Sequence, residues 1–369
     1  MGIRRRQIGY FFAVVLFIMF MVKPPIDNPR QGFDITFQIG AVLILAAFTI
    51  VYVNAWAGAF LTWVVIGAFV SALLYSDYKV LYTAQSIDAI RAIISGFIIY
   101  VIIVLLKPEE KWILNVFCGL LILHLGCQLG QFMNGHQSSG IMYNPNDGGT
   151  FAALCSVAFY RPKWRYFLFL PLASVVLAKS FGGFIGIGAG AIVFGFMHGY
   201  KIGLTVLILM VVGCVSYAFF VDMPGTIRFK AWDLGITFSF ENRWFIGTGA
   251  GNWKVFFQKL YADGYLNVGR PTFTRLHSTW IEGFVEMGIP FVILCIGFAG
   301  DNIRRFSKEA MIPMIGLAVI FGVGISNSFF KFNQLNGVVA IVWLALLEIK
   351  LRSESWLDQK NHLLGIGDS

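Results

Sequence analysis

Residues 203–221, with the sequence GLTVLILMVVGCVSYAFFV, contain no Asp, Glu, Lys or Arg and are followed by Asp222 and a Pro-Gly pair. A helix needs about 20 apolar residues to cross the hydrocarbon core of a bilayer, so this stretch is long enough to do so. Similar stretches fill most of the chain, which is 57% hydrophobic and 13% charged, whereas soluble proteins average about 25% charged residues. The composition excludes an ordinary soluble protein and predicts a membrane protein with many spans.

The apolar runs predict an all-α, polytopic membrane bundle of about twelve transmembrane helices with one large extracytoplasmic loop. The expected spans lie near residues 8–22, 34–53, 55–75, 88–106, 112–129, 147–160, 166–180, 182–199, 203–221, 279–300, 311–328 and 333–349. We therefore expect a membrane bundle at 1–221, an extracytoplasmic loop with short interfacial helices at 222–276, three further spans at 277–349 and a cytoplasmic tail at 350–369.

The Lys and Arg residues predict the orientation of this bundle. With the N-terminus inside, 15 of the 28 Lys and Arg residues fall in cytoplasmic segments, six in short outside loops and seven in the loop at 222–276. This distribution follows the positive-inside rule, so both termini are expected in the cytoplasm. Most of the net charge of +9 is then a topology signal, and no nucleic-acid partner is expected.

The loop at 222–276 is the outside segment long enough to fold on its own. It contains seven basic residues, four acidic residues and twelve interleaved aromatic residues. An interfacial belt of Trp and Tyr, with cations that meet anionic headgroups, explains such a composition. A site for a ligand with phosphate and sugar groups also explains it, and the composition alone leaves both interpretations open.

Two features of this loop and its end favour a site for phosphate and sugar groups over an interfacial belt. Arg228 and Trp232 have the spacing that places side chains on one face of a helix, where a cation beside an aromatic ring suits a phosphate and a sugar. His277 lies at the start of the next span, where the helix dipole disfavours a protonated imidazole, and a neutral histidine accepts protons. A purely structural His277 is the alternative. Thr279 and Glu282 have the spacing of a capping box, which favours a structural role for Glu282.

Other patterns in the chain predict no cofactor and no metal. The run GTGAGNW at 247–253 differs from the dinucleotide-binding pattern G-x-G-x-x-G, and we expect a tight turn there. The acids of the long loop are scattered and include no D-x-D pair, which argues against a dedicated divalent-metal site. The five cysteines lie in apolar runs without a C-x-x-C pair, as is typical of buried apolar positions.

Six short motifs occur one after another within the long loop and on either side of it. They are Asn144-Pro145-Asn146, Lys179-Ser180-Phe181-Gly182-Gly183, Arg228-x3-Trp232, NRWFIGTG at 242–249, His277-Ser278-Thr279-Trp280 and Glu286-Met287-Gly288. Together, over about 144–290, they resemble the membrane domain of the bacterial O-antigen ligases and O-antigen polymerases. The resemblance implies en-bloc transfer of a glycan from undecaprenyl diphosphate to a sugar hydroxyl at the periplasmic side of the bacterial inner membrane, with inversion and without a metal ion. The acceptor is a lipid A–core sugar for a ligase or a lipid-linked repeat unit for a polymerase, and the sequence leaves both open.

The resemblance also implies two catalytic residues. Such families place the arginine of the R-x3-W element on the diphosphate and a histidine at the end of the loop on the acceptor hydroxyl, and these roles fall on Arg228 and His277. The chemistry agrees, because a departing diphosphate must have its growing negative charge neutralised. Arginine offers bidentate contacts to phosphate for that purpose.

The chain departs from the family pattern at the position of a second basic residue, which would also contact the diphosphate. Related families often carry an arginine after the serine of an S-R-G-like element, and Phe181 occupies that position here. Lys179, Arg243 or Arg275 would supply the missing charge, and Trp232 completes the expected substrate-binding set. The structural alternative for Lys179 is a lysine that snorkels from a helix end.

Two other classes of function remain as alternatives. A flippase or transporter usually places paired charges near the membrane midplane. The candidates for such charges are Asp88, Arg91, His124 and Lys179, mostly near the ends of expected spans, and no inverted repeat is evident. A non-catalytic membrane scaffold is the third possibility.

Overall fold

The computed structural model is helical through most of the residues that it describes, which are 49, 53–74, 84–142, 144–220, 225–242, 244–251, 253, 257–258, 276–306, 310–326 and 335–363. No strand occurs among these residues. The all-α prediction is therefore confirmed for the described part of the chain. The first two expected spans, near 8–22 and 34–53, lie outside it apart from Thr49 and Val53.

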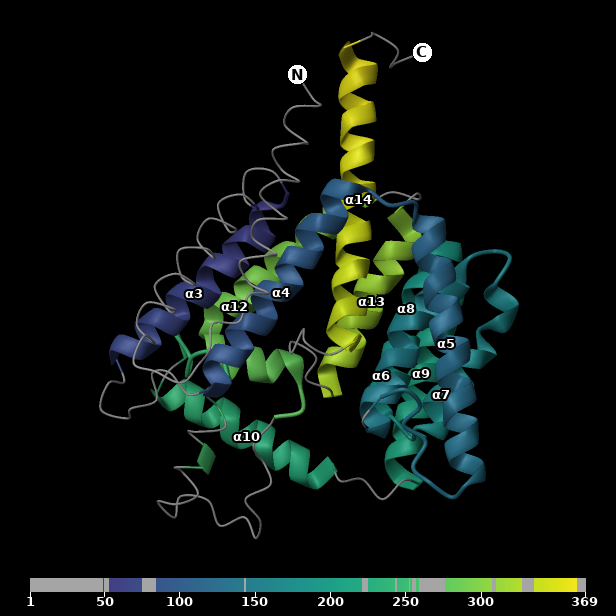
Figure 1. Cartoon of the computed structure of the whole chain (residues 1–369), viewed down its shortest axis with the longest axis horizontal. Coiled ribbons are helices and arrows are strands. Elements are labelled where there is room, and N and C mark those ends of the chain that lie inside the picture. The colour runs from purple at the N-terminus through teal and green to yellow at the C-terminus, as the bar shows by residue number, and fades with distance from the viewer. Residues whose placement is uncertain are drawn as a thin grey trace, which may run out of the picture. The chain divides into compact units, whose positions relative to one another are not determined.

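From residue 55 onward, each expected span has a helical counterpart (Figure 1). The elements are α3 (Ala55–Leu74), α4 (Ala84–Leu106), α5 (Glu110–Met133), α6 (Pro145–Ser156), η2 (Val157–Tyr160), η3 (Arg165–Phe167), α7 (Phe169–Leu177), α8 (Phe181–His198), α9 (Tyr200–Phe220), α10 (Gly225–Asn242), α12 (Thr279–Arg304), α13 (Met311–Ser326) and α14 (Leu335–Leu363). α14 continues well past the end of its apolar run, so the first part of the expected tail at 350–369 is helical.

Three helices in the described part of the chain are long and apolar enough to cross a membrane, namely α5, α8 and α12. α5 has 24 residues and is therefore about 36 Å long, which exceeds the ~30 Å hydrocarbon core. By contrast, α6 and α7 have 12 and 9 residues, fewer than the ~20 of a spanning helix. Residues 148–156 of α6 are all buried, so its apolar character serves the protein interior.

The described helices belong to two compact units. The first unit comprises Met1–Val101, Tyr217–Phe298 and Gly324–Gly337, and the second comprises Ile102–Ser216, Ala299–Val323 and Val338–Ser369. Some long helices, including α12 and α14, contribute residues to both units.

Glycines allow α8 to pack closely against α13 in the second unit. A Cβ atom added at Gly186 would collide with the side chain of Val323, and one added at Gly190 would lie 2.8 Å from Cγ2 of Val319. In the sequence, Gly182, Gly186 and Gly190 are spaced four residues apart in an apolar run, a pattern that favours close approach of another helix. Gly186 and Gly190 make that approach in the structure.

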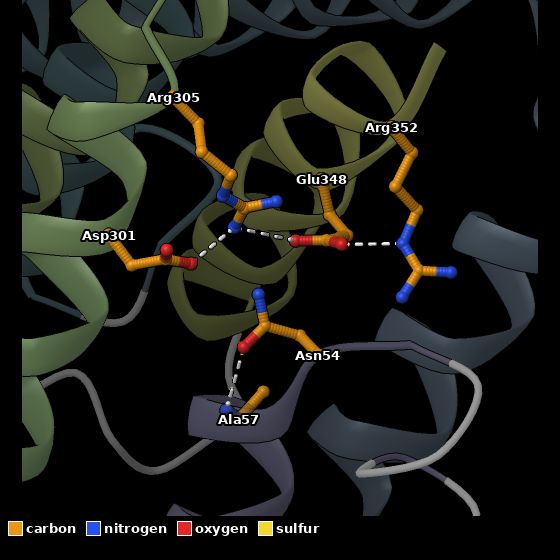
Figure 2. A network of polar contacts seen from close by, with 6 residues as sticks. All are labelled: Asn54, Ala57, Asp301, Arg305, Glu348 and Arg352. Carbon is orange, nitrogen blue, oxygen red and sulfur yellow. Dashed lines mark hydrogen bonds and ion pairs between the residues drawn. The ribbon is translucent and has the colours of Figure 1, made fainter. Parts of the chain in front are cut away.

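A buried carboxylate of α14 lies between two arginines in the second unit (Figure 2). Nε of Arg352 is 2.5 Å from Oε1 of Glu348, while Nη2 of Arg305 is 3.6 Å from Oε2 of Glu348 and 2.7 Å from Oδ2 of Asp301. Glu348 is 2% exposed, and a buried charge requires such partners. The network ties the end of α12 to α14.

α12 is broken at Gly288 in the first unit. This glycine has φ 71° and ψ −169°, which is not helical, and Pro290 follows two residues later. Pro290 also lacks the N–H that would continue the hydrogen-bond ladder. The expected span at 279–300 is therefore two helical segments, 279–287 and 289–304, which are joined by a kink.

Other segments of the first unit supply partners for the backbone groups at this break. Nε1 of Trp63, in α3, donates a hydrogen bond to the carbonyl of Met287 at 2.8 Å. The amide of Ile289 donates to the carbonyl of Trp244, also at 2.8 Å. Such partners are essential in apolar surroundings, where each unsatisfied backbone group costs several kcal/mol.

We predict that Gly288→Ala destabilises the protein. The backbone conformation at this position is open almost only to glycine and costs other residues about 1–3 kcal/mol. In addition, a Cβ atom would collide with the carbonyl of Phe245. Thermal unfolding of the purified protein in detergent should show a lower midpoint.

Gly300→Ala is the matched control for this variant, because it also lies in α12 and no described atom lies within 4 Å of the added Cβ. Alanine is about 1 kcal/mol more favourable than glycine inside a helix, so this control should melt at or above the wild-type midpoint. Equal stability of the two variants would contradict the role assigned to Gly288.

Candidate functional site

α10 carries two of the expected site residues. Residues Gly225–Asn242 are helical, so the prediction that Arg228 and Trp232 lie one turn apart on a helix is confirmed for the backbone. One face of α10 packs into an apolar cluster, and Trp232 is partly buried against it. The buried members of the cluster are Ala231, Trp253, Phe257, Leu276, Phe284 and Val285.

Trp232 links α10 to the end of the long loop. Its indole Nε1 donates a hydrogen bond to the carbonyl of Leu276 at 2.5 Å. Leu276 has no exposed surface, and its Cδ2 would lie 3.1 Å from a Cβ atom added at Gly235 of α10. The helix therefore holds the residue immediately before His277, so the structure places Trp232 next to the chain segment that carries His277.

His277 has an unusual backbone conformation. It is half-buried, and its φ of 51° lies in the left-handed region. That region costs a residue with a side chain roughly 1–2 kcal/mol, so the surrounding structure must enforce it. Such residues cluster at functional sites, and the expected catalytic histidine occupies one of these positions.

Ser278 fixes the other side of His277. Its Oγ accepts a hydrogen bond from the amide of Ile281 at 3.4 Å and donates to the carbonyl of Gly324 at 3.3 Å. Ser278 is thus the N-cap of α12, and the expected capping box, which requires Thr279 as the N-cap, is wrong. Serine and threonine both cap helices, and the contact with Gly324, which the sequence does not reveal, selects the serine.

The glycine turn at 247–253 wraps around the carboxylate of Glu286. The amides of Gly251 and Trp253 donate to its Oε2 and Oε1 at 2.9 and 3.4 Å, and the amide of Gly249 donates to its backbone carbonyl at 2.8 Å. The glycines of this turn have positive φ angles, which glycine adopts without strain. The tight-turn prediction is confirmed, and the turn attaches the long loop to the broken α12.

Two of the other motifs meet at the starts of α6 and α8 in the second unit. Oδ1 of Asn144 accepts from the amide of Asp147 at 2.9 Å and caps α6. Ser180 caps α8 and donates through Oγ to the carbonyl of Asn146 at 3.3 Å. Lys179 precedes this cap, is exposed and has φ 50°. Lys179 therefore lies beside two helix N-termini, while His277 belongs to the first unit.

The other expected cations lie outside what the structure describes. Arg243 and Arg275 are not among the described residues, and neither is the side chain of Arg228. Their contacts with a diphosphate stay predictions. Within the described part of the chain, no three His, Cys, Asp or Glu side chains lie together as a set of metal ligands.

Sequence reasoning missed the structural roles of Ser278 and Glu286. Glu286 entered the sequence analysis as one member of a short motif, without a contact of its own. A usable signal was present nearby, because Gly288 lies two residues before Pro290 in an apolar run, and kinks in helices concentrate at proline. A break at this point frees backbone groups that a neighbouring loop must satisfy.

Comparison with known proteins adds no assignment. No protein-family model matches this chain, and no curated protein matches it.

We predict that Glu286→Gln loosens the long loop. Hydrogen bonds to a charged group contribute about 1.5–3 kcal/mol, and the amide group of glutamine presents donors where Gly251 and Trp253 also donate. The variant should unfold at a lower temperature than the wild type, and a protease should cleave its long loop at a higher rate. Glu241→Gln, at an exposed position of α10, is the control. If both variants match the wild type in stability and cleavage, Glu286 does not hold the turn.

Proposed function

We propose that this protein is a membrane glycosyltransferase of the O-antigen ligase or polymerase type. It transfers a glycan en bloc from undecaprenyl diphosphate to a sugar hydroxyl, with inversion and without a metal ion. In this proposal it is a multi-pass protein of the bacterial inner membrane with both termini in the cytoplasm. The large loop at 222–276 and the start of α12 form its active site on the periplasmic side.

The observation that carries this proposal is the hydrogen bond from Trp232 to the carbonyl of Leu276. The sequence motifs that contain Arg228 and His277 are separated by the whole loop, yet this bond joins α10 to the residue before His277. Arg228 lies four residues before Trp232 on the same helix, which is about 6 Å along the helix axis. Two expected catalytic residues from distant motifs thus have their backbones in one part of the first unit.

In the proposed reaction, the acceptor hydroxyl oxygen attacks the anomeric carbon of the donor glycan from the face opposite the phosphate. His277 takes the hydroxyl proton, the bond from the anomeric carbon to the phosphate oxygen breaks, and undecaprenyl diphosphate leaves. Arg228 stabilises the negative charge that grows on the diphosphate. General-base help of this kind contributes roughly 10²–10⁴ in rate.

A transporter for a charged lipid or solute is the alternative from a different class, and the packing of His124 gives it little support. His124, in α5, has no exposed surface, and its Nδ1 accepts from the amide of Ile141 at 3.3 Å. A Cβ atom added at Gly140 would collide with the imidazole ring. A histidine packed this tightly is explained by its structural role, which is to anchor the segment after α5.

We predict that His277→Ala and Arg228→Ala each lower glycan transfer by 10²-fold or more. The first variant removes the proposed base, and the second removes charged hydrogen bonds of about 1.5–3 kcal/mol each. Transfer from a defined undecaprenyl-diphosphate glycan to acceptor, measured with purified protein in detergent or nanodiscs, provides the test.

His198→Ala and Arg304→Ala serve as controls, because both residues occur at helix ends in the other compact unit. All four variants should insert in the membrane and elute as folded protein. Wild-type transfer by either His277→Ala or Arg228→Ala would exclude the proposed mechanism.

We also predict that transfer continues in excess EDTA, because basic side chains neutralise the leaving group in this proposal. The assay compares initial rates with and without chelator at fixed ionic strength. Loss of activity that returns on addition of a divalent cation would remove the proposed role of the arginine.

A competition assay separates the two forms of this function. The same donor is offered with lipid A–core and with lipid-linked repeat units at equal concentration. Elongated lipid A–core identifies a ligase, whereas longer lipid-linked chains identify a polymerase.

A further inference from the structure

Two tryptophans of the same apolar cluster differ in what their indole N–H groups do. Nε1 of Trp232 donates to the carbonyl of Leu276. Nε1 of Trp253 is buried and has no hydrogen-bond partner among the described residues. Within one apolar cluster, the indole N–H of Trp232 thus bonds a backbone carbonyl, while that of Trp253 bonds no described residue. Trp253 is therefore a matched comparison for the bond of Trp232.

The bond of Trp232 acts on a short segment that is restrained from both sides. Leu276 is fully buried between α10 and the rest of the cluster, and Ser278 is tied to Ile281 and to Gly324. Between these two anchors, His277 has the left-handed φ of 51°. A peptide plane that is free to rotate at Leu276 would let His277 relax into an ordinary conformation. The indole N–H prevents that rotation because it holds the carbonyl of the same peptide unit.

We propose that Trp232 is a positioning residue for His277, which acts through the hydrogen bond from its indole N–H to Leu276. This inference rests on the proposed function, and it differs from the expected contact between Trp232 and a sugar. The N–H group is already directed at the protein backbone, and the ring packs against the apolar cluster. The side chain therefore sets the direction of the imidazole, while Arg228 on the same helix remains the group that meets the donor.

The first test needs no substrate. Trp232→Phe removes the indole N–H and keeps an aromatic ring, and Trp253→Phe makes the same change in the same cluster where no bond to a described residue is lost. Hydrogen–deuterium exchange of the full-length protein in nanodiscs compares peptides that cover residues 276–282. Trp232→Phe should raise exchange there at least about threefold, since a typical hydrogen bond contributes roughly that factor or more, whereas Trp253→Phe should leave exchange close to wild type. Equal exchange in the two variants would overturn the proposal.

The second test uses transfer kinetics. A displacement of about 1 Å at a catalytic group costs on the order of 100-fold in rate, so Trp232→Phe should lower kcat by about 10- to 100-fold. KM for the donor should stay within about twofold, because the donor does not bind to Trp232. A large rise in KM at unchanged kcat would instead identify Trp232 as a sugar-binding residue and refute the positioning role.

Trp232→Phe also reduces the size of the ring, so a second variant separates the loss of the N–H group from the loss of volume. Replacement of Trp232 by 3-benzothienylalanine exchanges the N–H for sulfur and keeps the bicyclic shape. This variant should reproduce the exchange and kcat defects of Trp232→Phe, and wild-type behaviour would overturn the proposal. If the wild-type protein shows no transfer at all, the proposed function fails, while the exchange comparison still decides whether Trp232 fixes the segment at 276–278.

Discussion

A helix that breaks among apolar surroundings must pass its freed N–H and C=O groups to other partners, since no water replaces them. In this protein the requirement arises at Gly288, and Trp63 and the segment 244–253 meet it. The indole N–H of Trp63 donates to the carbonyl of Met287, and the carbonyl of Trp244 accepts from the amide of Ile289. Two amides of the glycine turn donate to the carbonyls of residues 285 and 286. The long loop is therefore attached to α12 by main-chain hydrogen bonds, which give the first unit a fixed framework for the proposed site.

The proposed site is built on that framework from two directions. α10 approaches the loop end through Trp232 and the apolar cluster around Leu276. The start of α12 approaches it through the cap at Ser278, which is bonded to Gly324. His277 lies where the two meet, and its left-handed backbone is a local cost that the contacts on both sides offset. A catalytic group held in this way loses little entropy when substrate binds.

Several of the short motifs around the loop cap helices or form hydrogen bonds that connect separate segments of the chain. Asn144 and Ser180 cap neighbouring helices and are connected through Asn146, while the glycines of 247–253 enclose Glu286. Sequence reasoning placed the glycine turn correctly, because three glycines in five residues leave few other options. It could not identify Glu286 as the partner, since that pairing joins residues 33 to 35 positions apart and depends on where α12 breaks.

The sequence by itself determined the helical class, the approximate positions of the helices and the packing face at Gly186 and Gly190, because apolar runs and four-residue spacings are local properties of the chain. Only the tertiary structure decided that the expected spans at α6 and α7 are short helices and that the start of α12 is capped by Ser278. It also decided that Trp232 bonds Leu276. An apolar run is equally suited to lipid and to a protein interior, and a side-chain donor selects its acceptor only after distant segments have been brought together.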